Sequence, residues 1–214
     1  MDRPTIAIIG GTGDLGSGLA ARWAEAGYRV VLGSRSRDKA QSAAAEIGAN
    51  VRGEDNIGAA KAGDIVIIAV PFANHDATLA ELRAALEGKI VVDAAVPLVP
   101  PKVSVVQLPP LASAAQAAKR ILGAGVKVTS AFHNVGAKKL RGNGPVECDV
   151  LVFGDDKAAK DAVIALAAAA GTRGIDGGPL ENSVAAEALT SVLIGINRRY
   201  KVDGAGIRIT GLSA

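Results

Sequence analysis

Short apolar runs of strand length alternate with longer amphipathic stretches along nearly the whole chain. This rhythm limits the possible folds more than any other feature of the sequence. The runs lie at residues 5–9, 29–33, 64–70, 89–93, 127–131, 149–153 and 171–175. Several are continuously hydrophobic, as strands buried on both faces are. Helical patterns lie between them at residues 14–26, 37–47, 75–86, 113–122 and 157–169. Strands alternating with helices predict an α/β fold, with a doubly wound parallel sheet and right-handed crossovers.

Two segments depart from this rhythm. Residues 96–110 are rich in proline and predict a long irregular loop after the strand at residues 89–93. Ligands bind at the carboxyl ends of the strands of an open parallel sheet, so this loop is expected to form part of a site. Residues 180–200 predict one long helix that covers the site or a subunit interface. Its apolar face is expected to consist of Val184, Leu189, Val192, Leu193 and Ile196.

Composition excludes several classes of protein. The formal net charge is +3 and the basic residues are dispersed, which argues against a nucleic-acid surface. Cys148 is the only cysteine, so neither an intramolecular disulfide nor a thiolate metal cluster can form, and a cytoplasmic location is expected. The first predicted strand leaves no room for a signal peptide, and apolar runs such as residues 162–170 are too short to span a bilayer. We therefore expect no metal, nucleic-acid or membrane partner.

A glycine-rich turn follows the first predicted strand. Its sequence is Gly11-Thr12-Gly13-Asp14-Leu15-Gly16, and a helix opens within it. This strand–turn–helix context is what a dinucleotide-binding loop requires. The first glycine permits the tight turn, the second lets the backbone approach a pyrophosphate, and the third allows close helix–strand packing. The alternative is a turn that serves sheet packing alone. The loop makes the predicted fold Rossmann-type, with a nucleotide-binding domain at residues 1–178 and a small C-terminal helical segment at residues 179–214.

The end of the second predicted strand indicates which nucleotide binds. NAD-binding proteins place a carboxylate there for the ribose 2′-hydroxyl, whereas this chain has Ser34 and Arg35. A carboxylate would repel a 2′-phosphate, but Ser and Arg can bind one. Arg37 and Lys39 add positive charge at a helix N-terminus, where cations are otherwise unfavourable. These residues favour NADP(H) over NAD(H).

Acid–base signatures are absent from the sequence. Neither tyrosine has a lysine four residues on, and no nucleophile or metal motif is present. Hydride transfer between two cofactors needs no protein proton donor if the rings are held face to face. Val70 and Pro71 end a predicted strand where a nicotinamide ring would lie. His133 follows another strand and either contacts the ligand or secures a loop, whereas His75 begins a helix and is expected to be structural.

Several short motifs, in their order and spacing, resemble those of the F420-dependent NADP reductases. They are residues 9–16, 33–35, 70–71, 130–133, 153–156 and 176–180. The resemblance covers nearly the whole chain. It implies reversible hydride transfer between NADP(H) and the 8-hydroxy-5-deazaflavin coenzyme F420, and a homodimer. It also implies phosphate binding by Thr12, Ser34, Arg35 and Lys39. The deazaflavin would lie near Val96, Pro97, His133 and Val135, and the C-terminal segment around Ile207 would close the site.

Other functions stay open at this point. Residues 134–140 and 97–110 differ from the pattern of this family, and both would lie on the deazaflavin side. The alternatives are an NADPH-dependent reductase of a flavin or other small acceptor, and a non-catalytic NADP(H) sensor. Lys138, Lys139 and Arg141 either hold an acidic tail of coenzyme F420 or form a solvated helix face.

Overall fold

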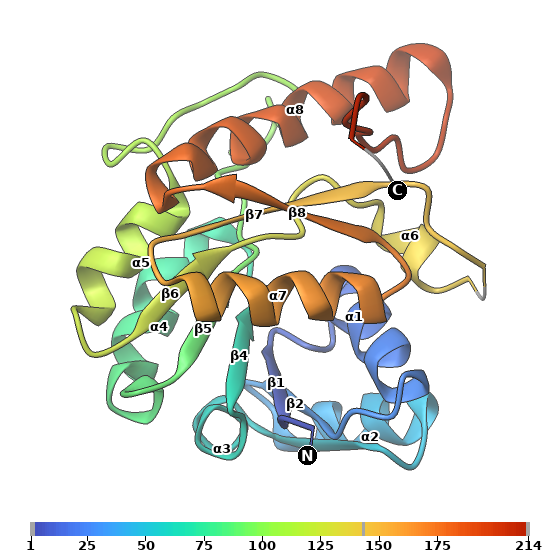
Figure 1. Ribbon diagram of the computed structural model, residues 1–214. Coiled ribbons are helices and arrows are strands. Elements are labelled where there is room, and N and C mark those ends of the chain that lie inside the picture. Colours follow the sequence, from blue (N-terminus) through green and yellow to red (C-terminus); the bar gives the residue numbers. More distant parts are fainter. Residues whose placement is uncertain (1–2, 143, 213–214) are drawn as a thin grey trace.

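The computed structural model describes residues 3–142 and 144–212. One sheet runs through the molecule in the strand order β3-β2-β1-β4-β5-β6-β7-β8 (Figure 1). The predicted Rossmann-type α/β fold is confirmed. The strands are β1 (Ile6–Ile9), β2 (Val30–Ser34), β3 (Val51–Asp55), β4 (Ile65–Ile68), β5 (Ile90–Asp93), β6 (Lys127–Ser130), β7 (Asp149–Gly154) and β8 (Arg173–Gly178).

Helices cover both faces of the sheet. On one face, Ile6 and Ile8 of β1 belong to the core that contains Trp23 of helix α1. On the other face, Ala7 and Ile9 belong to the core that contains Leu79 of helix α4. Successive residues of one strand are thus buried against opposite layers, which explains the continuous apolar runs. The first layer is α1 (Asp14–Glu25), α2 (Arg37–Ile47) and α7 (Lys157–Ala169), and the second is α3 (Asn56–Ala62), α4 (Phe72–Leu86) and α5 (Ala114–Leu122).

The sheet is not parallel throughout, which corrects the sequence prediction. Strands β6 and β7 pair antiparallel, with Thr129 opposite Gly154 and Ser130 opposite Phe153. A parallel pair needs a crossover that returns the chain to the same end of the sheet, usually through a helix. The described residues of the connection form only the short helix α6 (Ala137–Leu140), which was not predicted. The chain therefore turns back and enters β7 in the opposite direction.

The unit formed by β3 and α3 was also missed from the sequence. Strand β3 lies at the edge of the sheet and has the sequence VRGED, in which Val51 and Gly53 are buried. Such a short polar strand carries little hydrophobic signal. Its position depends on Gly53, because a Cβ there would lie 2.2 Å from the backbone of Ala40 in α2.

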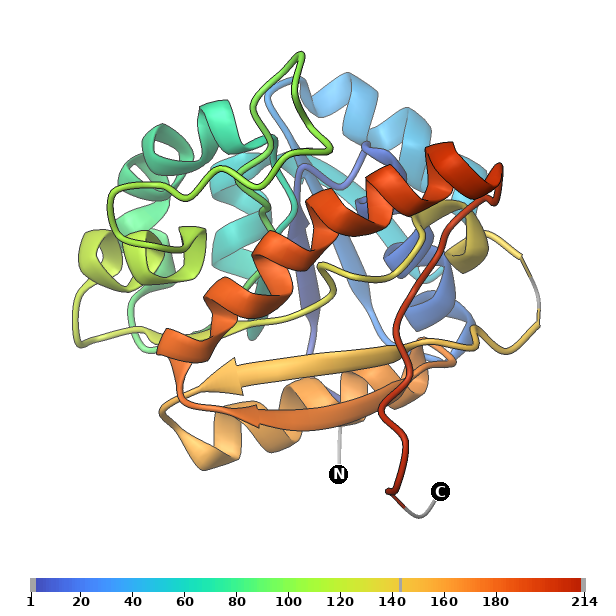
Figure 2. The same ribbon diagram turned by 90° about the horizontal axis from the view of Figure 1, so that it is seen from above.

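Of the predicted apolar face of the C-terminal helix, only Leu193 is buried, while Val184, Leu189 and Ile196 are half-buried. The segment forms a short 3₁₀ helix, η1 (Leu180–Asn182), followed by α8 (Ser183–Tyr200). The buried residues of α8 are Ser183, Ala186, Glu187, Ser191 and Leu193, whereas Val192 is 45% exposed. Helix α8 lies at the carboxyl ends of the central strands (Figure 2). Polar contacts hold it there. Asn134 Nδ2 donates to the Ala186 carbonyl at 2.8 Å, and Thr190 Oγ1 donates to the His133 carbonyl at 3.0 Å.

No helix within the described ranges is long and apolar enough to cross a membrane. The division into a nucleotide-binding domain at residues 1–178 and a C-terminal segment at residues 179–214 stays a prediction.

Gly53→Ala tests the close packing of α2 on β3. We expect a loss of about 1–3 kcal/mol in the free energy of unfolding, because the added methyl group meets backbone atoms that cannot move independently. Urea denaturation measures this loss. Gly144→Ala is the control, since a Cβ at that position has nothing within 4 Å. Equal midpoints for both variants would contradict the role assigned to Gly53.

Candidate functional site

The glycine-rich turn joins β1 to α1 at the centre of the sheet. Strand β1 lies between β2 and β4, so the strand order reverses at this point and a crevice opens beyond the carboxyl ends. Gly13 is the N-cap of α1 and has no side chain to occupy the helix N-terminus. Gly16 lies against the turn itself, where a Cβ would be 2.8 Å from the Cα of Gly11. Helix α1 can therefore begin directly on the strand, with its amide groups open to an anion.

A cleft of about 760 Å³ opens at this reversal point. It is continuous from the glycine-rich turn past the ends of β2, β4 and β5. The sequence-predicted residues that line it are Thr12, Gly13, Asp14, Leu15, Ser34, Arg35, Val70, Pro71 and Val96. Segments distant in the sequence thus meet in one cavity of the size that small ligands occupy.

One end of the cleft is positively charged. Arg35 is exposed, lines the cleft and has no ion-pair partner among the described residues. Arg37 instead pairs with Glu54 of β3 at 2.8 Å. Lys39 is exposed near the start of α2 but does not line the cleft. Arg35 is therefore the basic side chain best placed for an anionic group at this end.

The opposite end lies between β4 and β5. Pro71 is the N-cap of α4, and the first turn of this helix contributes Phe72, Ala73 and Asn74 to the wall. The facing wall is the segment after β5, with Ala94, Ala95 and Val96. The proline-rich loop adds Leu98, Pro100 and Val103, as its position after a strand predicts. Pro97 is buried and does not line the cleft.

Like Lys39 and Pro97, three further predicted residues lie outside this cleft. His133 is buried: its Nε2 is 3.2 Å from Ser130 Oγ, and its Nδ1 has no partner. Burial lowers the pKa of His133 to about 4, so the ring is neutral. Val135 is buried beside it in the chain. Ile207 lies in the C-terminal tail, where its carbonyl accepts from the Asp149 amide at 2.8 Å. Contact of these three with a second ligand stays a prediction.

Two of the three basic residues around α6, Lys138 and Arg141, form ion pairs. Lys138 pairs with Asp203 at 3.0 Å, and Arg141 reaches Asp14 at the start of α1 at 2.5 Å. Arg141 also donates to Ser17 Oγ at 3.2 Å. These contacts keep Arg141 at the rim of the glycine-rich turn, and both ion pairs are largely exposed.

Sequence reasoning missed two side chains that bear on the site. Asn56 lines the cleft, and its buried Oδ1 lacks a hydrogen-bond partner. It belongs to the missed β3–α3 unit, so no pattern pointed to it. Glu187 is 1% exposed and accepts from the amides of Ala114 at 2.7 Å and Ala115 at 3.2 Å. The signal that could have identified Glu187 is its acidic side chain on a helix that is itself expected to be partly buried.

In the described part of the chain, no group of three or more His, Cys, Asp or Glu residues is placed to hold a metal ion.

A glycine-rich turn at the reversal point of a mainly parallel sheet defines a Rossmann-type dinucleotide-binding protein. The family model of the coenzyme F420-dependent NADP oxidoreductases matches residues 5–97. The F420-dependent NADP reductase of Methanocaldococcus jannaschii is 43% identical, with 97% of this chain and 98% of the relative covered. The enzyme of that name from Methanothermobacter marburgensis is 39% identical, with 97% and 98% covered. A crystal structure of a candidate F420-dependent NADP reductase from Arthrobacter sp. FB24 superposes with a TM-score of 0.80 at 27% identity, with 97% of this chain and 100% of that chain covered. The chain belongs to the family of F420-dependent NADP reductases.

Glu187 makes the stability of the fold depend on pH. Burial raises its pKa from 4.5 to about 7, against the opposing effect of the two amides. Because the folded-state pKa is the higher one, the contribution is full below pH 4.5 and is lost as the pH rises through 7. Relative to Glu187→Gln, the free energy of unfolding of the unmodified protein should therefore fall across this window, as measured by urea denaturation. Glu181→Gln, at an exposed position, is the control, and its free energy of unfolding should depend on pH as that of the unmodified protein does. If the difference in free energy of unfolding between the unmodified protein and Glu187→Gln did not change with pH, the raised pKa of Glu187 would be contradicted.

Proposed function

We propose that this protein transfers a hydride reversibly between NADP(H) and coenzyme F420. The observation that carries the proposal is the sequence similarity to F420-dependent NADP reductases over nearly the full length of the chain. It is combined with a cleft that places Arg35 beside a glycine-rich turn. These relatives do not favour the flavin reductase or the sensor that the sequence left open. No group with an acid–base role is required, because the two cofactors supply the chemistry once they are aligned.

We assign residues to the parts of NADP(H) by their position along the cleft, from its β2 end to its β4–β5 end. We assign the pyrophosphate to the amides around Gly11, Thr12, Gly13, Asp14 and Leu15, with Gly16 maintaining the packing of α1. Ser34 and Arg35 then receive the 2′-phosphate, and Lys39 adds positive charge nearby. Val70, Pro71 and Val96 border the nicotinamide. The support for this direction is that Ser34 and Arg35 lie at the β2 end and the apolar residues at the β4–β5 end.

The deazaflavin is assigned to the side of the nicotinamide that α8 covers, near Pro97, His133, Val135 and Ile207. One observation supports this side. The buried Nδ1 of His133, which lies on this side, has no hydrogen-bond partner among the described residues. A ligand that supplies a hydrogen-bond partner would remove the cost of leaving such an atom unpaired.

A homodimer in the cytoplasm completes the proposal. Its support is the apolar surface of the proline-rich loop and α8, where Val105 is 55% exposed, Leu108 is 58% exposed and Val192 is 45% exposed. Apolar residues gathered on a surface favour an interface. Both the dimer and the location stay predictions.

Mixing the purified protein with NADPH and oxidised coenzyme F420 tests the reaction. We expect the near-ultraviolet band of NADPH and the visible band of oxidised F420 to decrease together, because each hydride lost by one cofactor is gained by the other. A protein that binds NADPH but changes neither band would contradict the proposal. Turnover with FMN alone would do so as well.

Arg35→Ala tests the assignment of the 2′-phosphate. Loss of a charge-assisted contact of ~1.5–3 kcal/mol should weaken NADPH binding by roughly 10- to 100-fold, while NADH binding hardly changes. Isothermal titration calorimetry measures both affinities. Arg37→Ala is the matched control, since Arg37 is engaged by Glu54 and does not line the cleft. Equal losses for NADPH and NADH would show that Arg35 does not contact the 2′-phosphate.

A further inference from the structure

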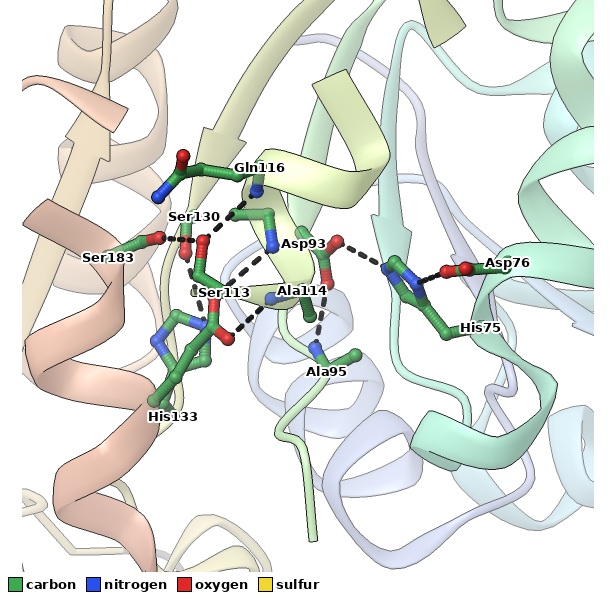
Figure 3. Close-up of polar contacts among 12 residues, drawn as sticks. His75, Asp76, Asp93, Ala95, Ser113, Ala114, Gln116, Ser130, His133 and Ser183 are labelled. Carbon is green, nitrogen blue, oxygen red and sulfur yellow. Dashed lines mark hydrogen bonds and ion pairs between the residues drawn. The ribbon is translucent and has the colours of Figure 1, made fainter. Parts of the chain in front are cut away.

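His75 is buried between two carboxylates at the base of the cleft. It is fully buried, its Nε2 lies 2.6 Å from Asp93 Oδ2, and its Nδ1 lies 2.8 Å from Asp76 Oδ1 (Figure 3). Asp93 is also fully buried, whereas the side chain of Asp76 is 64% exposed. A buried carboxylate and imidazole are tolerated in a protein interior only when they satisfy each other. The contact between His75 and Asp93 is therefore an obligatory link between α4 and β5.

Both ends of this link continue directly into the walls of the cleft. Asp93 ends β5, and its second oxygen, Oδ1, accepts from the Ala95 amide at 2.9 Å. The carboxylate thereby holds the segment from Ala94 to Val96, which forms one wall. His75 lies in the first turn of α4. The residues of this turn that precede it, Phe72, Ala73 and Asn74, form the facing wall. The ring of Phe72, which lines that wall, stacks on His75 with centroids 6.1 Å apart.

The protonation state makes this link an ion pair. Burial lowers the pKa of His75, but the hydrogen bonds and charges of Asp93 and Asp76 outweigh it and raise the pKa from 6.5 to about 9. Both ring nitrogens therefore donate at neutral pH. The side chains of His133 and Glu187 also face the charge of Asp93, but neither is hydrogen-bonded to its carboxylate, whose partners are His75 and the Ala95 amide. Since the folded-state pKa of His75 is raised, its contribution is full below pH 6.5 and is lost as the pH rises through 9.

We propose that His75 and Asp93 are positioning residues that set the separation of the two cleft walls at the nicotinamide end, and through it the rate of hydride transfer. The inference rests on the function proposed above. Neither His75 nor Asp93 lines the cleft, so His75 acts through Phe72 on one wall and Asp93 through Ala95 on the other. Hydride transfer is sensitive to such positioning, because a displacement of about 1 Å can cost about 100-fold in rate. The adenosine end of the cleft does not depend on this pair.

Two variants of His75 separate positioning from general damage. Gln places an amide nitrogen near the position of Nε2 and can still donate to Asp93, whereas Asn cannot reach it. We expect His75→Asn to lower kcat by about 10- to 100-fold and His75→Gln to recover much of the loss. Affinity for 2′,5′-ADP, which carries the 2′-phosphate but no nicotinamide, should not change in either variant. Thr129→Val is the control, because it removes a buried hydrogen bond between β6 and β5, from Thr129 Oγ1 to the Val91 carbonyl at 3.0 Å, outside the cleft. It should retain the unmodified kcat.

A measurement on the unmodified protein serves if the variants do not fold. The chain has two histidines, so ¹⁵N NMR of the imidazole rings resolves His75 from His133. At pH 7.5 we expect both ring nitrogens of His75 to be protonated, and its signals to shift with NADP⁺ but not with 2′,5′-ADP (the pH lies below the raised pKa of about 9).

The inference would be overturned by His75→Asn with unmodified kcat, by equal losses of kcat and 2′,5′-ADP affinity, or by equal NMR shifts with both ligands. Failure of the proposed function is distinguishable from these outcomes, because the unmodified protein itself would then transfer no hydride from NADPH to F420.

Discussion

The contact between the start of α1 and the turn that follows β1 is the constraint on which the rest of the structure depends. Gly16 lies against the backbone of the turn, so the helix begins on the strand and its N-terminus opens into the crevice between β2 and β4. Neighbouring parallel strands then bring their own carboxyl ends to the same edge. Ser34 and Arg35 on one side, and Val70 and Pro71 on the other, thereby line one cleft.

Buried titratable side chains are concentrated at the same edge of an otherwise aliphatic interior. His75, Asp93, His133 and Glu187 all lie near the ends of β5 and β6 or on the helices that cover them. Burying these groups is costly unless each is satisfied, and the hydrogen bonds of Asp93 and Glu187 meet that condition. These contacts link the two walls of the cleft to each other, and α8 to α5, and satisfied buried polar contacts of this kind specify one arrangement of the elements they join.

The sequence was sufficient to predict the central strands and the residues of the glycine-rich turn that line the cleft, because both depend on local patterns. Hydrophobic runs predicted β1, β2 and β4, and the glycine spacing predicted the turn. The edge unit of β3 and α3 escaped because its strand is polar and short, and Asn56 escaped with it. The direction of β7 and the polar buried face of α8 depend on tertiary contacts that periodicity does not contain. His75 was expected to be structural because it begins a helix. Its contact with Asp93 could not be predicted, because Asp93 lies on another element and only the fold brings the two together.

In this account the protein aligns two cofactors and keeps water from the path between them, while the hydrogen passes directly from one ring to the other. The most direct test uses NADPH that carries deuterium at both C4 positions, with reduced coenzyme F420 analysed by mass spectrometry and NMR. The account predicts one deuterium bound at C5 of the deazaflavin for each turnover in ordinary water. Hydrogen from the solvent at C5 would contradict it, because an exchangeable group would then stand between the two cofactors.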